Sequence, residues 1–526
     1  MAFPQLKIEG SYWHNLKIEE GDIEYLYNFL FEKETPLLTA VLARAMIKER
    51  IANKINSQKS RQKKLGTTYL PKDKHKIGEH LVFPALNWEK GVVKSLRDGK
   101  NPDLEPFKII EVEFENGKKR AFASELEAHI LNAPEQVNVV DPSLDEVIIF
   151  NKFGKQIVAK LEKELSISKD LVRIGTDWFP KSLIIDFNLG HLNLAEAVLD
   201  MHNGGPLDPK ELLEQIEADV SENPELSEFS LNFALQEDER FDEVGTEGVF
   251  SWFLRRNEPE SVREIPQFLQ YTPIEFDADF LTKEMLQIQA NIDDELIQSD
   301  IISEISTSSN AFVLNFPHWR VGSIPLTPRL SNFFPTAIET QRVKITIIDK
   351  DTDQEISAWV VRPYHYVYGL REWYEERDLI PGSIINLETS DDPGKVYIQP
   401  QKRRSNREWI KTILVGVDGG IVIALLKQPV AADFQERMAI VVPDANSIDQ
   451  IWKERTSKPK SLKSDALKMM QELAKLNPQR HVHFLELYAA INVFQRCPPG
   501  PIMSLLASEQ EFNHVGDHYY HLKDAK

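Results

Sequence analysis

Blocks with a helical hydrophobic pattern alternate along this chain with blocks that have a strand-like pattern. Apolar residues recur at helical spacing in 35–64, form short strand-like runs across 66–132, and return to helical spacing after residue 141. A pattern that changes this often is typical of several small domains joined in series. The length of 526 residues agrees, because one domain usually takes about 100–200 residues.

The first block of strands lies in 66–135. Turn residues separate its short β-type runs, and Asn116-Gly117 between two runs is a hairpin signal. Several short strands in about 60 residues are typical of a small SH3-like or Tudor-like barrel. Such barrels bind nucleic acid or protein equally readily. One edge of this barrel is expected to be basic: Lys94, Arg97, Lys100, Lys118, Lys119 and Arg120.

Residues 190–256 have the pattern of helix, turn, two further helices and a short strand pair. The stretches LNLAEAVLDMHNGGPLDPKELLEQI and DERFDEVGTEGVFSWFL resemble the HARE-HTH winged-helix family, which includes the delta subunit of bacterial RNA polymerase. The resemblance implies a non-enzymatic module that links DNA to transcription or chromatin machinery. A phosphate-binding wing should be basic, so this acidic copy is expected to contact protein. Its acidic residues are Glu237, Asp238, Glu239, Asp242, Glu243 and Glu247.

Residues 311–400 are β-rich. The order GSIPLTPRLSNFFP, a strand pair with a tryptophan, GLREWYEERDLIPGSIINL and KVYI resembles the DNA-binding pseudobarrel of plant auxin-response factors and restriction-endonuclease effector domains. In that family two arms grip the major groove, where arginine pairs with guanine and tyrosine bonds phosphate. The alternative is that the aromatic residues fill the barrel core and the arginines are surface charges. The resemblance places the arms at Trp319, Arg320 and Ser323, and at Arg362, Tyr364 and His365.

Residues 446–526 are predicted to form a second winged helix. Three helical runs precede two short strands around Gly516-Asp517. The ending FNHVGDHYYHL is similar to RFDEVG…WFL of the first module, which indicates a diverged internal repeat. Three basic residues of this segment are expected within reach of phosphates: Lys468, Arg480 and Arg496.

These blocks predict an α+β multi-domain fold in which winged-helix modules are combined with small SH3-like and pseudobarrel β-domains. The expected parts are an N-terminal helical segment (1–65), the small barrel (66–135), a helical linker domain (136–189), the HARE-HTH-like winged helix (190–256), an acidic helical linker (257–308), the pseudobarrel-like domain (309–400), a β extension (401–445) and the C-terminal winged helix (446–526). A helix is expected to start at Thr35-Pro36, the helical linker domain to stop at 178–180, and an acidic helix to span 281–300.

Charge is distributed unevenly. The chain has 62 basic and 82 acidic residues, a net charge of −20, and a uniformly acidic surface repels a polyanion. Basic runs at 44–64 and 402–411 and acidic runs at 212–247 and 274–304 indicate segregated faces, although basic runs are ordinarily solvated helix faces or loops. The candidate DNA-binding residues are Arg320, Ser323, Arg362, Tyr364, His365, Arg403, Arg404, Arg407, Lys59, Arg61, Lys63 and Lys64.

No catalytic motif is found in the sequence. It lacks a GxxxxGK phosphate loop, a GxSxG elbow and an HExxH metal motif. The one cysteine, Cys497, rules out an internal disulfide and a cysteine-rich zinc site, and fits a reducing compartment. No catalytic residue, metal or cofactor is therefore expected. The absence of a secretory leader and of a long apolar run predicts a cytoplasmic protein without a membrane partner.

Three functions agree with these patterns. The first is a non-enzymatic protein, associated with transcription or chromatin, that anchors to duplex DNA by its basic segments and reads bases with pseudobarrel arms or a winged helix. The second is a protein-interaction scaffold that docks on RNA polymerase or another transcription complex without binding DNA. The third is a nuclease-like enzyme, for which Glu111, Glu113 and Lys118 have a superficial similarity to a catalytic set.

Overall fold

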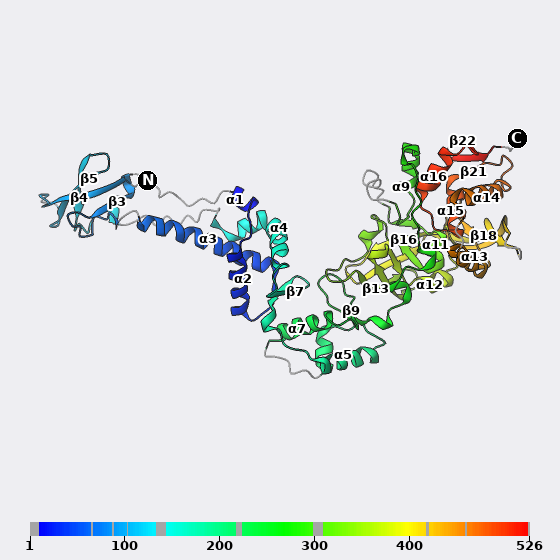
Figure 1. Cartoon of the computed structure of the whole chain (residues 1–526), viewed down its shortest axis with the longest axis horizontal. Coiled ribbons are helices and arrows are strands. Elements are labelled where there is room, and N and C mark those ends of the chain that lie inside the picture. Colours follow the sequence, from blue (N-terminus) through cyan, green and yellow to red (C-terminus); the bar gives the residue numbers. More distant parts are fainter. Residues whose placement is uncertain are drawn as a thin grey trace. The chain divides into compact units, whose positions relative to one another are not determined.

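The computed structural model describes residues 10–64, 67–86, 89–101, 104–132, 144–216, 223–297, 309–416, 420–457 and 460–523. It forms two compact units, Met1–Ile185 and Asp186–Lys526, each with its own hydrophobic cores (Figure 1). Helices are combined with several separate sheets, which confirms the α+β class and the division into more than one domain. None of the helices in the described ranges has the length and apolar character needed to cross a bilayer.

A five-stranded, mostly antiparallel sheet forms the β-domain of unit one. Its strands, in the order β2-β3-β4-β5-β6, are β2 (Thr67–Thr68), β3 (His80–Phe83), β4 (Glu89–Asp98), β5 (Lys108–Phe114) and β6 (Lys119–Ser124). The predicted strand runs and the hairpin at Asn116-Gly117 are confirmed, and Gly117 has the positive φ that such a turn requires. Aromatic side chains fill the core, and the rings of Phe83 and Phe122 lie 4.4 Å apart.

The rest of unit one is a helical body with a small sheet. Its elements are α1 (Gly10–His14), α2 (Glu20–Lys33), β1 (Leu37–Leu38), α3 (Thr39–Lys64), α4 (Glu146–Leu165), β7 (Leu171–Ile174) and β8 (Asp177–Pro180). Trp13, Leu42, Ile157 and Trp178 belong to one hydrophobic core. The segments predicted as an N-terminal helical segment and a helical linker domain therefore fold together, with the β-domain inserted between α3 and α4 in the sequence.

Long-range pairing moves two predicted boundaries of this body. Leu37-Leu38 pair with Trp178 and Asp177 as strand β1, so α3 begins at Thr39 and not directly after Pro36. Residues 178–180 were predicted to stop a helix, but they belong to strand β8. The indole N–H of Trp178 donates to Thr39 Oγ1 at 3.0 Å, which ties the start of α3 to this sheet.

Unit two begins with three helices and a strand pair. They are α5 (Leu189–Met201), α6 (Pro209–Gln215), α7 (Pro224–Gln236), β9 (Phe241–Glu243) and β10 (Trp252–Leu254). Asp208 caps α6 by accepting from the Lys210 N–H at 2.8 Å, and Pro209 follows it as the first residue of the helix, which is a usual order at a helix start. Leu207 bridges to Trp252 and extends this small sheet.

A mixed seven-stranded sheet follows, in the order β11-β16-β17-β13-β14-β15-β12. Only β13 and β17 pair in parallel; β13 alternates buried and half-buried residues, as a strand with one covered face should. The elements are β11 (Ala311–Val313), α11 (Phe316–Val321), β12 (Ser323–Pro325), β13 (Arg342–Asp349), β14 (Glu355–Val361), β15 (Tyr366–Tyr368), α12 (Arg371–Glu376), β16 (Ile384–Thr389) and β17 (Lys395–Pro400).

The acidic helix predicted over 281–300 is wrong in its extent. Helix α9 spans Lys283–Ala290 and ends before the acidic cluster. Asp293 pairs with Arg329, and the fully buried Asp294 pairs with Arg496. These carboxylates point into the protein toward arginines, so they do not form a solvated helical face. Residues 298–300 of the predicted helix lie outside the described part.

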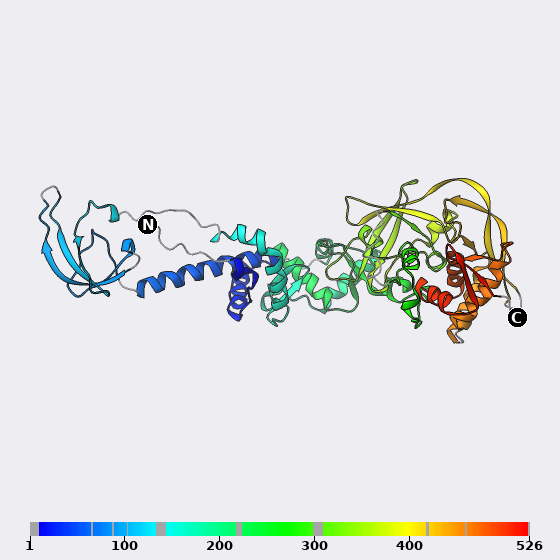
Figure 2. The same cartoon turned by 90° about the horizontal axis from the view of Figure 1, so that it is seen from above.

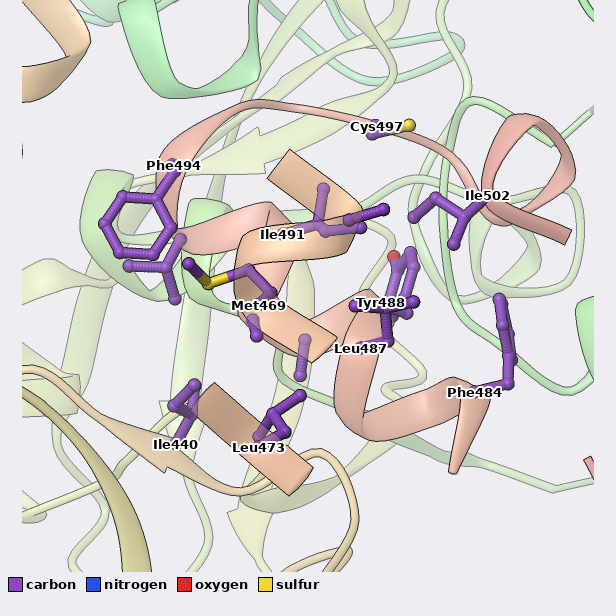
Figure 3. Packing of buried hydrophobic residues seen from close by; sticks show 14 of the residues in the cluster. Ile440, Met469, Leu473, Phe484, Leu487, Tyr488, Ile491, Phe494, Cys497 and Ile502 are labelled. Carbon is purple, nitrogen blue, oxygen red and sulfur yellow. The ribbon is translucent and has the colours of Figure 1, made fainter. Parts of the chain in front are cut away.

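The C-terminal part joins a long hairpin to a helical body. Its elements are β18 (Lys402–Val415), β19 (Ile421–Ala432), β20 (Ile440–Val441), α13 (Ala445–Ser457), α14 (Leu462–Ala474), β21 (Val482–His483), α15 (Phe484–Phe494), α16 (Pro499–Ser508), β22 (Phe512–Gly516) and β23 (Tyr519–Leu522). Figure 3 shows side chains of α14 and α15, with Ile440 and Ile502, meeting in one core. Cys497 lies in that core, where burial raises the pKa of its thiol.

One order of elements occurs three times. The order is a helix, a short strand or single β-bridge, two helices and two strands. It occurs in the helical body of unit one (α2 to β8), in α5 to β10, and in α14 to β23. In each, the last strand lies between the other two: β1-β8-β7, Leu207-β10-β9 and β21-β23-β22. We call these the first, second and third three-helix bodies. The sequence indicated a repeat only for the second and third.

Candidate nucleic-acid interface

Arg320, from the first predicted arm, is held in an internal ion pair. Its Nε and Nη2 lie 3.0 and 2.5 Å from the two carboxylate oxygens of Asp449 in α13. The guanidinium also lies 5.6 Å from the centre of the Phe268 ring, and only 11% of the side chain is exposed. Since the bidentate fork is occupied, contact with a guanine edge would require this pair to open.

Ser323, from the same arm, is completely buried in β12. Its hydroxyl lies 2.8 Å from His318 Nδ1, and His318 Nε2 lies 2.8 Å from a carboxylate oxygen of Glu295. Serine, histidine and carboxylate in series are the parts of a nucleophilic triad. Here neither Ser323 nor His318 is exposed to solvent, so we interpret the series as a network that holds α11, β12 and the preceding linker together.

The second predicted arm is also largely engaged. Arg362 Nη2 donates to the carbonyl oxygens of Pro335 and Phe334 at 2.6 and 3.3 Å, and burial lowers the pKa of this guanidinium. The hydroxyl of Tyr364 donates to the Arg263 carbonyl at 3.1 Å. His365 is exposed and has a positive φ. His365 is therefore the exposed residue of this arm, while Arg362 and Tyr364 are half-buried.

The structure describes different amounts of the two predicted basic runs, 402–411 and 44–64. Arg403 pairs with Glu408 and Asp433, whereas Arg407 is exposed and has no ion pair among the described residues. The side chain of Arg404 lies outside the described part. The same holds for four residues of α3, whose backbone continues as helix through them: Lys59, Arg61, Lys63 and Lys64.

In the third three-helix body, the expected phosphate contact Arg496 is fully buried. Its Nη1 lies 2.9 Å from Asp294 Oδ2, and its Nη2 lies 3.0 Å from Glu295 Oε1. Asp294 also accepts from the Tyr488 hydroxyl at 2.6 Å. Arg496 therefore cannot reach a phosphate in this arrangement. It neutralises two buried carboxylates, which would otherwise be costly to desolvate.

The acidic strand pair of the second three-helix body packs on the neighbouring seven-stranded sheet. The Lys344 N–H donates to the Val244 carbonyl at 2.9 Å, and the Glu247 N–H donates to the Thr336 carbonyl at 2.8 Å. Phe253 meets Trp359 edge to face with ring centres 5.2 Å apart. The acidic segment therefore contacts the seven-stranded sheet of the same unit.

Two carboxylates at this contact are buried. Burial raises the pKa of Glu243 to about 7, although the N–H groups of Gly245 and Ser251 partly oppose this by donating to its Oε1. Burial also raises the pKa of Glu258 to about 8, with Asp242 beside it. Arg342 lies 3.4 Å from Asp242 and from Glu258 and offsets part of their charge. The acidic segment is therefore accommodated by burial and by arginine.

A solvated basic stripe runs along α4 in the first three-helix body. Residues separated by three or four positions share one helix face, and on this face Ile148, Lys152, Lys155, Ala159 and Lys163 are all exposed. None of the three lysines has an ion pair among the described residues. Glu162, which is half-buried, is the one acidic residue that the same spacing places on the stripe, so three lysines against one carboxylate leave the face cationic.

Helix α3 carries two further exposed basic residues, but they do not lie on this face. The helix packs against α4, and the Arg44 guanidinium lies 4.5 Å from the centre of the Phe150 ring, on the side of α4 opposite to the lysine stripe (Figure 1). Lys48 lies one turn after Arg44 on the same face of α3, and both are exposed. Neither has an ion pair among the residues that the structure describes. We call the exposed stripe with Lys152, Lys155 and Lys163 the α4 cationic face.

The third helix differs among the three bodies. Helix α4 carries the lysine stripe, α7 has acidic but no basic residues, and α16 has no charged residue at all. Most of α16 is buried, including Ile502 and Met503. Of these three helices, α4 is therefore the one whose exposed face is suited to a polyanion.

Sequence reasoning placed Arg44 and Lys48 in a basic run but did not single out the lysines of α4. Their helical spacing is visible in NKFGKQIVAKLEK, which would have been the signal. No group of three or more histidine, cysteine or acidic side chains that could hold a metal occurs among the described residues. Comparisons of the chain with protein-family models, curated proteins and solved structures give no match.

Proposed function

We propose that this chain is a non-enzymatic protein that binds duplex DNA through its first three-helix body. Helix, strand, two helices and two strands, with the last strand in the middle, is the arrangement of a winged helix. In helix-turn-helix proteins the recognition helix enters the major groove, and α4 would take that role here. The observation that carries the proposal is the α4 cationic face, whose three lysines are exposed and have no ion pair among the described residues.

The same proposal assigns roles to the other domains. The second and third three-helix bodies would be winged helices used inside the chain, because their third helices lack basic residues. The β2–β6 domain would be an SH3-like barrel, and the seven-stranded domain a pseudobarrel, as the sequence resemblance implies. The HARE-HTH resemblance of the second body remains part of the proposal, together with an association with transcription or chromatin.

The chemistry of the bound state follows from the residues on α4. Lysines that neutralise phosphates release condensed counterions, and this term dominates non-specific affinity. Asn151, which is exposed beside the stripe, has the amide that pairs bidentately with adenine. Exposed Val147 and Ile148 offer apolar contact to a thymine methyl group. The lysines would thus anchor the helix, and Asn151 would give sequence preference.

The test is a salt series on duplex binding by the full chain. Fluorescence anisotropy with a mixed-sequence duplex should show affinity falling with salt, and Lys152→Ala/Lys155→Ala should reduce the log–log salt slope by about 2, since each phosphate contact contributes about 0.9. The matched control is Lys283→Ala/Lys453→Ala, which removes two exposed helical lysines from unit two. Its slope should equal that of the unchanged chain.

Two results would refute the proposal. One is a salt slope that the α4 double variant leaves unchanged while the chain still binds duplex DNA. The other is no measurable duplex affinity together with co-purification in a large complex, which the scaffold alternative predicts. Metal-dependent cleavage of the duplex would instead favour the nuclease-like alternative.

A further inference from the structure

The β18–β19 hairpin exposes an unusual concentration of apolar side chains. Figure 2 shows its two long strands (yellow to orange) curving along unit two. The odd-numbered residues Ile421 and Ile423 face the C-terminal core and are buried. On the opposite face Leu414, Val422 and Leu426 are 41%, 52% and 38% exposed. Single exposed apolar residues are ordinary, but a cluster of them on one strand pair marks an interaction surface.

Strand β19 is also the edge of its sheet, whose order is β19-β18-β20. The Gly416 N–H donates to the Gly420 carbonyl at 2.7 Å, so this opposed pair is hydrogen-bonded. Opposed pairs alternate between bonded and non-bonded in an antiparallel ladder, and the register has no shift between Val415↔Ile421 and Asn406↔Val430. The even-numbered residues of β19 therefore bond to β18, and the odd-numbered ones direct their N–H and C=O groups outward.

The outward-facing groups occupy a short, bounded segment. Ile421, Ile423, Leu425 and Lys427 direct both groups away from β18, and no partner strand meets them within the described residues. Pro429 is the next outward-facing residue, and proline has no N–H to offer, which suits an edge strand. The segment available for strand addition is thus 421–427, and its midpoint is Ala424.

We propose that a second copy of this chain adds to this edge, so that two β19 strands pair antiparallel about a two-fold axis at Ala424. This axis sets Ile421 opposite Lys427 and Ile423 opposite Leu425 of the second copy, and each of these pairs exchanges two backbone hydrogen bonds. On the exposed face it sets Val422 opposite Leu426 and Ala424 opposite itself. A two-fold interface needs such a self-complementary patch, and apolar cross-strand pairs stabilise a sheet.

Electrostatics are compatible with this pairing despite the net charge of −20. Residues 420–432 contain no acidic side chain, and Lys427 is their one charged residue. Two copies can therefore approach at β19 without bringing carboxylates together. This inference is independent of the proposed DNA site, which lies in the other unit.

The test is the mass of the full chain in solution, measured by sedimentation equilibrium over a concentration series. The unchanged chain should shift from 60.5 kDa toward twice that mass. Val422→Lys/Leu426→Lys places like charges opposite one another in the proposed register and should abolish the shift. Val422→Lys/Leu426→Glu places opposite charges there and should retain it.

Two further variants distinguish a loss of dimerisation from a loss of folding. Leu414→Lys changes the same exposed face but lies on β18, away from the edge, and should still dimerise. Leu425→Pro removes an outward-facing N–H without removing a β18–β19 bond, and should be monomeric. A chain that stays at 60.5 kDa up to about 100 µM, or a double-lysine variant that keeps the doubled mass, would overturn the proposal. A lysine/glutamate variant as monomeric as the double-lysine variant would overturn the two-fold register.

Discussion

At the residue scale, buried carboxylates explain how an acidic chain folds without a large electrostatic penalty. Asp294 and Glu295 share Arg496 in the interior, while Glu243 relies on two backbone N–H groups. The first arrangement offsets the charge, and the second leaves a carboxylate that prefers to be protonated. Several arginines take part in these internal ion pairs: Arg320, Arg342 and Arg496 each pair with a carboxylate.

Glu243 should make stability depend on pH. Its folded pKa is about 7 against an ordinary value of 4.5, so its stabilising contribution is complete below pH 4.5 and is lost as pH rises through 7. Relative to the unchanged chain, Glu243→Gln should therefore be more stable at pH 8.5 than at pH 4.5, by up to about 3 kcal/mol, because one pKa unit is about 1.4 kcal/mol.

Urea unfolding of unit two at the two pH values measures this difference. Glu239→Gln, which removes an exposed carboxylate of the same body, is the control for the change in net charge. An effect of Glu243→Gln that is equal at both pH values would show that its carboxyl titrates normally.

At the element scale, short-range patterns predicted the strands β3–β6, because turn and hairpin signals lie within a few residues of one another. Contacts between distant residues could not be predicted. The pairing of Leu38 with Asp177 created β1, and the Arg320–Asp449 pair joins residues 129 positions apart. The candidate site shows the same limit: the spacing of Lys152 and Lys155 is visible in the sequence, but which face of α4 stays exposed depends on its packing against α3.

The second three-helix body should be energetically coupled to the seven-stranded sheet through Phe253. This side chain is 4% exposed and meets Trp359 edge to face. Phe253→Ala should destabilise unit two by about 3–5 kcal/mol through loss of a buried aromatic ring. In a double-mutant cycle of Phe253→Leu with Trp359→Leu, the coupling energy should be about 0.5–1.5 kcal/mol. Additive effects in denaturant unfolding would show that this pair does not couple the two elements energetically.

At the scale of the whole molecule, the proposed DNA-binding face and the proposed dimer edge lie in different units. The α4 cationic face belongs to 1–185, whereas the β18–β19 hairpin edge belongs to 186–526. Each unit has its own cores, so each is expected to fold when the chain is separated between Ile185 and Asp186. Circular dichroism and cooperative unfolding of the two fragments would check this first.

Duplex binding by these two fragments, compared with the full chain at the same salt concentration, is the most direct measurement of where DNA affinity resides. The fragment 1–185 should bind a mixed-sequence duplex, and Lys152→Ala/Lys155→Ala should weaken that binding. The fragment 186–526 should not bind. Affinity found in 186–526 and missing from a folded 1–185 would contradict the assignment of DNA binding to α4.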